Sequence, residues 1–245
     1  GIGFIAGVRC VVVVDDSGIM AGAMTGSTGY KIIRSEQVAL EQKLPYIHLV
    51  ESAGGDLINY RVEGFSRGGA LFSSQAKLSA AGVPIISILH GSSTAGGAYM
   101  PGMSDYVVAV KGNGRAFLAG PPLLKAATGE IATEEELGGA EMHASVSGLV
   151  EYLAENDADA IIMAREVVGR LGWNTGCPRP LIDSATPPLY DPDEIAGVVP
   201  IDYRKPYDVR EVICRVVDGS DFSDFKPRYG VSTVCVQASV MGFRC

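Results

Sequence analysis

The sequence predicts an α/β fold in which helices are layered on a sheet of largely parallel strands. Two observations carry this prediction. From the N-terminus to Leu171, short runs of β-branched residues alternate with helical patterns, which is typical of parallel strands joined by helical crossovers. The run Pro84–Leu89 is apolar almost throughout, as expected for a strand that is buried on both faces.

The first half of the chain supplies most of the predicted elements. Residues Phe4–Val14 predict two short strands around Gly7, because β-branched residues dominate the segment. Helices with apolar residues at 3.6-residue spacing and short apolar strands then follow in turn. We expect a turn at Thr25–Ser27, helices at Tyr30–Lys43 and at Ala70–Ala81 with a stop at Gly82, and strands at Pro45–Val50, Pro84–Leu89, Tyr106–Val110 and Phe117–Leu118.

The second half is mainly helical and is then interrupted by prolines. Thr133 and Glu136 have the spacing of a capping box, and Asp157–Leu171 repeats apolar residues at helical spacing. Between Asn174 and Asp193, proline density blocks helix and sheet alike, which predicts a linker or a surface strap. The prolines are Pro178, Pro180, Pro187, Pro188 and Pro192; beyond them we expect a short helix at Val209–Val217 and a strand at Thr233–Val240.

Two similar tetrapeptides follow apolar runs near the two ends of the chain. They are Gly7-Val8-Arg9-Cys10 and Gly242-Phe243-Arg244-Cys245. Coincidence over four residues is one explanation. The other is that a second copy of the fold begins near Arg228 and is cut off, which a chain ending in mid-strand favours, because strands need partners for their backbone groups.

Composition excludes several classes of function. The 245 residues carry a formal net charge of −8, which disfavours nucleic acid and anionic membrane surfaces through repulsion of phosphate. No apolar run reaches the roughly 20 residues that a membrane helix needs. The five cysteines are widely spaced, which argues against a zinc knuckle and favours reduced thiols in the cytosol or a mitochondrial matrix.

Two glycine-rich turns follow predicted strands and are the first candidates for a site. One is Ser52-Ala53-Gly54-Gly55, and the other is Thr94-Ala95-Gly96-Gly97-Ala98-Tyr99. Ligands of parallel α/β folds bind at the carboxyl ends of strands, and glycine lets the backbone approach them closely. If each turn offers one backbone N–H to a single oxygen, the pair forms an oxyanion hole suited to a thioester enolate. The alternative is that these glycines only permit tight turns.

A third segment, Phe117–Glu130, holds two adjacent prolines that suit a helix start. Lys125, Lys31 and Arg34 are candidates for holding a phosphate, although such side chains are more often simply solvated. The histidines have no metal-ligand spacing, and two of them fall in or next to apolar strands, where a wall histidine is the more common case. They are His48, His90 and His143.

Three segments together resemble the carboxyltransferase β subunits of biotin-dependent acyl-CoA carboxylases, most closely the 3-methylcrotonyl-CoA branch. They are Thr94–Tyr99, Phe117–Glu130 and Leu137–His143. The resemblance covers nearly the whole chain and implies a crotonase-like fold of ββα superhelical units. It also implies three parts: residues 1–175 as an N-terminal carboxyltransferase domain that binds acyl-CoA, 176–227 as a proline-rich linker with a short helix, and 228–245 as the start of a truncated C-terminal carboxyltransferase domain.

The implied activity is the transfer of CO2 from carboxybiotin to an acyl-CoA, such as 3-methylcrotonyl-CoA or a related short or branched acyl-CoA. Carboxybiotin would supply the CO2 and biotin the base, so that the protein need only hold the enolate oxygen. This role falls to the backbone N–H groups of Gly54, Gly96 and Gly97. The expected substrate-binding residues are Ala53, Gly55, Thr94, Ala95, Ala98, Tyr99, Gly120, Pro121 and Lys125.

One departure from the family pattern affects the first turn. Relatives usually read Ser-Gly-Gly-Ala, whereas this chain reads Ser52-Ala53-Gly54-Gly55, which leaves open which amide faces the thioester. The resemblance further implies a biotin carboxylase and biotin carboxyl carrier (α) subunit as partner, a homo-oligomer in the form of a hexamer of β subunits, and no metal in this chain. The expected location is the bacterial cytoplasm or the mitochondrial matrix.

Three other functions are compatible with parts of the sequence. A biotin-dependent acyl-CoA decarboxylase would use the same first domain. A Clp-like serine hydrolase would use Ser93 as nucleophile and His143 as base. A non-catalytic assembly subunit is the third, and on this view the 245 residues alone bind acyl-CoA but transfer no carboxyl group.

Overall fold

The computed structural model describes residues 1–56, 58–59, 61–173, 185–202 and 204–245. It divides into two compact units, unit 1 from Gly1 to Asn174 and unit 2 from Thr175 to Cys245. Much of the proline-rich stretch, including Pro178 and Pro180, lies outside the described residues. The predicted boundaries at residues 175 and 228 remain predictions.

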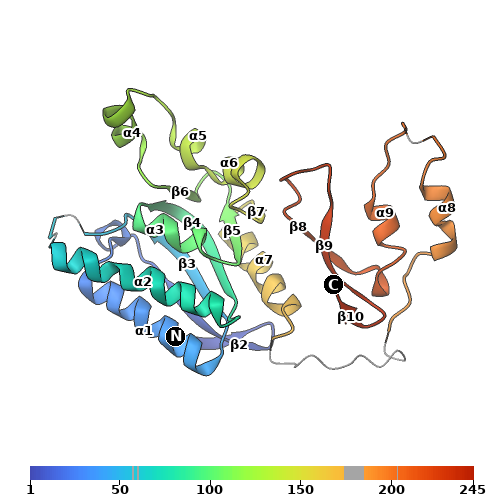
Figure 1. Ribbon diagram of the computed structural model, residues 1–245, viewed down its shortest axis with the longest axis horizontal. Coiled ribbons are helices and arrows are strands. Elements are labelled where there is room, and N and C mark those ends of the chain that lie inside the picture. Colours follow the sequence, from blue (N-terminus) through green and yellow to red (C-terminus); the bar gives the residue numbers. More distant parts are fainter. Residues whose placement is uncertain (57, 60, 174–184, 203) are drawn as a thin grey trace. The chain divides into compact units, whose positions relative to one another are not determined.

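Unit 1 is built on a seven-stranded sheet in the order β1-β2-β3-β4-β5-β7, with β6 paired to β4. All neighbours from β2 onward are parallel, and only β1 and β2 are antiparallel. This confirms the predicted α/β class with a parallel sheet (Figure 1). The strands are β1 Ile2–Ile5, β2 Val8–Val14, β3 Tyr46–Ser52, β4 Ile85–Thr94, β5 Tyr106–Val110, β6 Arg115–Phe117 and β7 Tyr152–Ala154.

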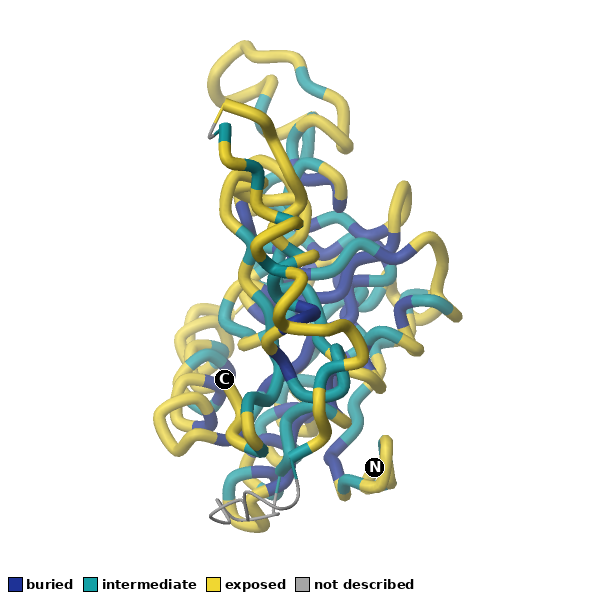
Figure 2. Tube along the Cα trace, turned by 90° about the vertical axis from the view of Figure 1, so that its right-hand side faces the viewer, coloured by how far each residue is buried: buried dark blue, intermediate teal, exposed yellow. Residues whose placement is uncertain are grey.

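Helices α1 (Gly26–Gln42) and α2 (Val62–Ala80) pack side by side on one face of the sheet (Figure 1). On this face, Ala39 of α1 and Leu78 of α2 belong to one apolar cluster with Tyr46 of β3 and Ile85 of β4. Helix α7 (Asp157–Arg170) covers the other face with its small and β-branched residues. Figure 2 shows the buried positions along the Cα trace in dark blue, the intermediate ones in teal and the exposed ones in yellow.

Several boundaries differ from the sequence prediction for identifiable reasons. Gly26 and Ser27 already belong to α1, because the Thr25 side chain caps the helix by accepting the N–H of Thr28. Helix α2 begins at Val62, eight residues before the predicted start at Ala70, although three glycines in this stretch lower its helix propensity. Strand β4 continues to Thr94, because its last residues pair with β6. Strand β7 was not predicted.

Short helices follow the second glycine turn along the chain. Helix α3 (Gly96–Gly102) starts at the predicted glycine pair, and α4 (Pro121–Thr128) starts at the predicted proline pair. Helix α5 (Glu134–Gly138) has the capping box predicted for Thr133 and Glu136. Helix α6 (Ala140–Met142) then runs into a π-helical turn at His143–Ser147.

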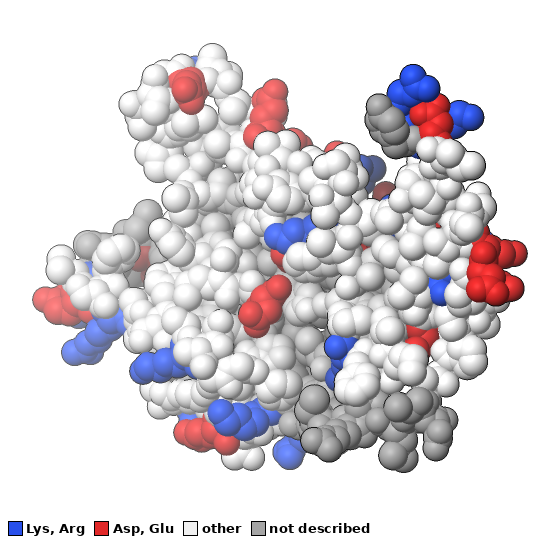
Figure 3. All heavy atoms as spheres, turned by 45° about the vertical axis from the view of Figure 1, so that its right-hand side comes forward, with Lys and Arg blue, Asp and Glu red and all other residues white. Residues whose placement is uncertain are grey.

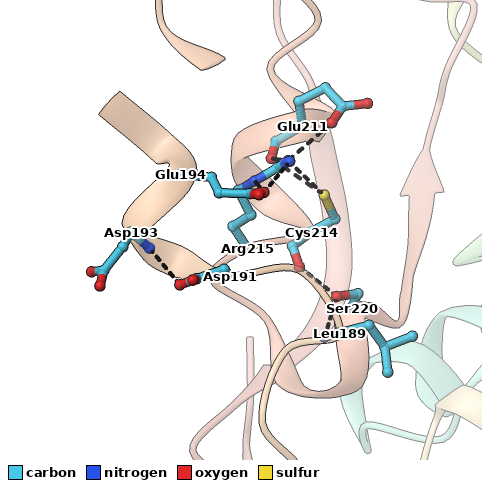
Figure 4. A network of polar contacts seen from close by, with 8 residues as sticks. All are labelled: Leu189, Asp191, Asp193, Glu194, Glu211, Cys214, Arg215 and Ser220. Carbon is cyan, nitrogen blue, oxygen red and sulfur yellow. Dashed lines mark hydrogen bonds and ion pairs between the residues drawn. The ribbon is translucent and has the colours of Figure 1, made fainter. Parts of the chain in front are cut away.

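Unit 2 contains short helices and a three-stranded antiparallel sheet in the order β10-β9-β8. Arg215 holds its helical part together, since it donates hydrogen bonds to Glu194 at 3.0 Å and to Glu211 at 2.9 Å (Figure 4). The elements are α8 Ile195–Val198, α9 Arg210–Ile213, β8 Phe222–Phe225, β9 Cys235–Val240 and β10 Phe243–Arg244. The helix predicted at Val209–Val217 is therefore shorter than expected, and the strand predicted from Thr233 begins at Cys235.

The two similar tetrapeptides occupy the same local structure. In the first hairpin Ala6 and Gly7 join β1 to β2 with φ angles of 47° and 79°, and in the second Met241 and Gly242 join β9 to β10 with 53° and 79°. Two consecutive positive φ angles are typical of the type I′ turn of a two-residue hairpin. The resemblance between the two ends of the chain thus extends from sequence to backbone geometry.

Candidate active site at two strand ends

The two glycine turns lie against each other at the carboxyl ends of β3 and β4. The two strands are neighbours, and Ser52 is in register with Ser93. A Cβ atom on Gly54 would lie 2.8 Å from the carbonyl oxygen of Thr94 and 3.4 Å from Cβ of Ala95. The structure therefore brings the two turns into contact, and the φ angle of +86° at Gly54 suits glycine alone.

Internal hydrogen bonds engage two amides of the first turn. The N–H of Gly54 donates to Oγ of Ser52 at 3.1 Å, while the Ser52 hydroxyl donates to the carbonyl of Gly22 at 2.8 Å. The N–H of Ala53 donates to the carbonyl of Ala21 at 3.0 Å. Because both N–H groups have a partner within the protein, neither Ala53 nor Gly54 offers a free donor in this conformation.

The amide of Gly55 is differently placed. Gly55 forms a parallel bridge with Met24, in which Met24 N–H donates to Gly54 O at 2.7 Å and Asp56 N–H donates to Met24 O at 3.2 Å. In a parallel bridge of this kind the central residue directs its own N–H away from its partner. Within the described part of the chain, no acceptor is assigned to the Gly55 N–H.

The second turn leads directly from β4 into α3. Ala95 adopts φ 50° and ψ −116°, an unusual conformation for a residue with a side chain. The amides of Gly96 and Gly97 then open the helix, and the first N–H groups of a helix have no intrahelical acceptor. Among the described residues neither amide has another acceptor. Both N–H groups thus point from the positive end of the short helix.

Gly97 also has a packing role. A Cβ atom at this position would come within 2.9 Å of Ser52 Cβ and 3.0 Å of Ser52 O. Only glycine allows α3 to pack this closely on the end of β3. Packing therefore requires glycine at position 97 whatever the role of its amide, and the alternative that these glycines only permit tight turns stays open.

The remaining predicted binding residues lie at the end of β4, in α3 and at α4. Thr94 pairs with Phe117, and the N–H of Ala95 donates to Phe117 O at 3.0 Å. Ala98 packs against the apolar cluster that includes Ala140 of α6, whereas Tyr99 is 48% exposed. Gly120, Pro121 and Lys125 follow Phe117 as the N-cap, first residue and last turn of α4, a helix without buried residues.

The serine hydrolase reading is not compatible with this geometry. Ser93 is 0% exposed, and its hydroxyl has no hydrogen-bond partner in the described structure. The ring of His143 is engaged at both nitrogens, with Nε2 2.7 Å from Ala116 O and Nδ1 2.7 Å from Ser147 Oγ. The Nε2 contact with a carbonyl requires a donor, so His143 is held as a structural side chain instead of a base for Ser93.

Charge around the first turn includes a fixed carboxylate. The side chain and backbone N–H groups of Asn59 hydrogen-bond Asp56 and lower the pKa of its carboxyl group below the ordinary value. On the face shown in Figure 3, acidic and basic side chains are interspersed. Among the described residues there is no group of three His, Cys, Asp or Glu side chains that could hold a metal ion. None of the described helices has the length and apolarity required to cross a bilayer.

The roles of two residues in this region were not predicted from sequence, although Ser52 was named as part of the first turn. Ser52 organises the first turn through its hydroxyl. Met24 pairs with Gly55 of the same turn through a backbone bridge. A serine at the end of an apolar strand is a weak signal for Ser52. The sequence around Met24 does not indicate its pairing with the first turn, because this pairing depends on the path of the loop before α1.

Comparison with known proteins shows the family of the chain. The model of the carboxyl transferase domain family matches residues 1–244. The chain belongs to the carboxyl transferase domain family. It is 50% identical over 243 residues to a probable biotin-dependent acyl-coenzyme A carboxylase beta2 subunit of Mycobacterium tuberculosis, covering 99% of this chain and 45% of that protein. It is 46% identical over 244 residues to the mitochondrial methylcrotonoyl-CoA carboxylase beta chain of Dictyostelium discoideum, covering 99% and 41%.

Two solved carboxyl transferases have the same fold. The hexameric transcarboxylase 12S aligns over 100% of this chain and 47% of its own, with a TM-score of 0.87 and 31% identity. The beta subunit of geranyl-CoA carboxylase from P. aeruginosa aligns over 100% and 46%, with a TM-score of 0.67 and 51% identity. The crotonase-like α/β fold expected from the resemblance is thereby confirmed. The chain spans about half the length of the curated relatives it matches.

Proposed function

We propose that this chain holds the acyl carbonyl of a coenzyme A thioester and serves the carboxyltransferase half-reaction of a biotin-dependent acyl-CoA carboxylase. The observation behind it is that two turns abut at the ends of β3 and β4, where the amides of Gly55, Gly96 and Gly97 have no acceptor among the described residues. Family membership supplies the reaction class.

The amides would stabilise the negative charge that develops on the thioester oxygen when a proton leaves a carbon in conjugation with the carbonyl, which in a 3-methyl-2-enoyl group is a γ carbon. Removing one donor of such a site typically costs about 3–4 kcal/mol of barrier. Since Gly54 already donates to Ser52, the proposal assigns the first donor to Gly55 and gives Gly54 the role of fixing the turn. Gly96 and Gly97 supply the second donor at the start of α3.

Carboxybiotin, when bound, supplies the carboxyl group and the base, so no side-chain base is required of this chain. We propose that carboxybiotin arrives on a biotin-carrying α subunit, that the β subunits assemble as a hexamer, and that the complex works in a bacterial cytoplasm or a mitochondrial matrix. These assignments draw on the names of the relatives. Lys125 is the proposed contact for a coenzyme A phosphate, and 3-methylcrotonyl-CoA or a related acyl-CoA is the proposed substrate.

Infrared difference spectroscopy tests the carbonyl site directly. 3-Methylcrotonyl-CoA labelled with ¹³C at the thioester carbonyl is added to the full-length protein. Hydrogen bonds from two amides polarise the carbonyl, so its stretching band should move to lower wavenumber on binding. Gly96→Pro removes one N–H at a helix position that tolerates proline, and it should reduce this displacement, whereas Gly96→Ala keeps the N–H and serves as the matched control.

A bound carbonyl band that stays at its position in water would contradict the amide site. The reaction direction is tested separately with the biotin-carrying partner present. ATP-driven carboxylation of the acyl-CoA supports the carboxylase, and CO2 release from a carboxylated acyl-CoA without ATP-driven carboxylation supports the decarboxylase.

A further inference from the structure

The segment Leu137–His143 lies outside the two glycine turns, yet it contacts the strand that holds the second turn. Strand β6 pairs with β4 along one edge, where Ala116 is in register with Ser93. Along its other edge β6 meets α5 and the residues that follow this helix. On that edge Nε2 of His143 lies 2.7 Å from the carbonyl oxygen of Ala116. Strand β6 therefore links His143 to the second turn.

Carbonyl groups of β6 accept hydrogen bonds on both edges of the strand. Phe117 O accepts the N–H of Ala95 at 3.0 Å on the side of β4, and Ala116 O accepts from the His143 ring on the other side. Ala95 has the unfavourable φ of 50° and directly precedes the two amides that open α3. Because a strained residue keeps its conformation only where its surroundings enforce it, the position of β6 sets the direction of these amides.

The backbone that carries His143 is itself held in place by packing. A Cβ atom on Gly138 would overlap the carbonyl oxygen of Ala116, so the end of α5 lies directly against β6. Ala140 and Ala144 are buried in the apolar cluster that also contains Ala116. These two alanines flank His143 along the chain, and the ring therefore reaches β6 from a fixed position.

Ser147 determines which ring nitrogen of His143 carries the proton. The two residues are the first and last of one π-helical turn, and Oγ of Ser147 lies 2.7 Å from Nδ1. A carbonyl oxygen only accepts hydrogen bonds, so Nε2 carries a proton toward Ala116, and Nδ1 of the neutral ring accepts from the serine hydroxyl. The pair of side chains thus keeps a donor directed at β6.

We infer that His143 is a positioning residue for the proposed carbonyl site, an inference that rests on the proposed function. Its bond to Ala116 holds β6, and β6 holds Ala95, so that the two amides that follow keep their direction while charge develops on the thioester oxygen. In this role His143 transfers no proton. Its loss should therefore affect the stabilisation of the transition state more than the binding of acyl-CoA.

Two amide side chains of different reach test this bond at His143. The amide nitrogen of glutamine can take the position of Nε2, whereas that of asparagine ends near the position of Nδ1. With the full-length protein and its biotin-carrying partner, His143→Asn should lower kcat by about tenfold to a hundredfold, because a small misplacement of groups around a reacting centre has an effect of this size. KM for 3-methylcrotonyl-CoA should stay within about threefold of the parent. His143→Gln should restore most of kcat.

Infrared spectroscopy and a matched control separate positioning from stability. The carbonyl band of the ¹³C-labelled substrate should be displaced less in His143→Asn than in the parent or in His143→Gln. Ser145→Ala is the control, because Ser145 Oγ donates to Glu141 O at 2.7 Å within the segment that carries His143. This variant also loses one side-chain hydrogen bond of that segment, but its kcat and carbonyl band should equal those of the parent.

A measurement on the parent protein covers the case in which His143→Asn fails to fold. Ring ¹⁵N NMR of the histidine-labelled full-length protein reports which nitrogen is protonated, and the signal missing from His143→Gln identifies His143. The parent should show a protonated Nε2. A neutral ring with its only proton on Nδ1 cannot donate to Ala116 and would overturn the inference.

The kinetic outcomes distinguish this inference from the proposed function. If the parent binds and carboxylates acyl-CoA, but His143→Asn keeps the parent's kcat and carbonyl band, the residue is merely structural and the inference is overturned, whatever the melting temperature of the variant. Equal impairment of His143→Asn and His143→Gln overturns it as well. If the parent protein neither binds a coenzyme A thioester nor displaces its carbonyl band, the proposed function itself fails.

Discussion

Glycine at position 97 is required by packing, because the Cα atom lies directly against the end of β3. The nearest atoms to an added methyl group are the Cβ and carbonyl oxygen of Ser52, and neither can rotate away. The same serine fixes Gly54 through its hydroxyl. One residue therefore sets both the separation of the two turns and the orientation of the first.

Gly97→Ala should push α3 away from β3 and weaken the binding of acyl-CoA. Forcing an extra methyl group into a packed contact typically costs about 1–3 kcal/mol. Thermal unfolding and isothermal titration with acyl-CoA measure the two effects. Gly102→Ala on the same helix is the control, since nothing lies within 4 Å of its Cβ position; equal behaviour of the two variants would argue against the packing role.

Glu36 gives the protein a pH-dependent stability. This residue lies on the buried side of α1, and one of its carboxyl oxygens has no hydrogen-bond partner among the described residues. Burial raises its pKa from 4.5 to about 7. Because the folded state binds the proton more tightly than the unfolded state, this contribution to stability is complete below pH 4.5 and is lost as the pH rises through 7.

Glu36→Gln should therefore stabilise the protein at pH 8 by about 1–3 kcal/mol relative to the parent and have little effect at pH 4. Urea unfolding at the two pH values measures this difference. The control is Glu41→Gln on the same helix, where the carboxylate is exposed and lies 3.6 Å from Arg34. A constant difference between Glu36→Gln and the parent across this pH range would contradict the assignment.

At the scale of elements, periodicity and turn chemistry predicted most of unit 1 from the sequence. Tyr106–Val110 was predicted with its observed bounds, as was the capping box at Thr133. Boundaries were missed where tertiary pairing decides, as in the extension of β4 by its contact with β6. The sequence correctly placed the two glycine turns at neighbouring strand ends, and their role as a binding site remains a prediction. The free amide of the first turn was not predictable, since it depends on the Ser52 side chain and on a bridge to Met24.

The β1–β2 hairpin offers a test of turn chemistry. Ala6 holds a positive φ of 47°, where a side chain other than Asn or Asp is unfavourable. Ala6→Asn creates the preferred Asn-Gly pair and should stabilise the protein by about 0.5–1 kcal/mol. Gly7→Ala, at a φ of 79°, should destabilise it. Chemical denaturation measures the free energy of unfolding of both variants. If both variants change it in the same direction, turn conformation is not the cause.

At the scale of the whole molecule, the chain combines a complete parallel sheet in unit 1 with a hairpin in unit 2 that repeats the first hairpin of the chain. Its relatives are about twice as long. The two hairpins share turn geometry as well as four similar residues. The sequence-based hypothesis that a second copy of the fold begins near Arg228 remains a prediction.

The hypothesis that carboxyl transfer needs residues beyond these 245 predicts a division of labour. We expect the 245-residue chain to bind acyl-CoA through the two turns and to transfer no carboxyl group when the biotin-carrying partner is added. Isothermal titration measures the first property and incorporation of labelled bicarbonate into acyl-CoA the second. The full-length protein is the control, and transfer by the 245 residues alone would refute the hypothesis.

The backbone at Ala95 has a chemical consequence of its own. A sharp strand-to-helix bend followed by a free amide is the arrangement in which many hydrolases display their attacking serine. Here the bend, with φ 50° and ψ −116°, carries only a methyl group. Under the proposed function, the amides polarise the thioester carbonyl but no side-chain nucleophile stands at this bend, so the bond to sulfur survives while a carbon in conjugation with the carbonyl becomes acidic. An inert side chain at this bend directs the chemistry from cleavage to carbon–carbon bond formation.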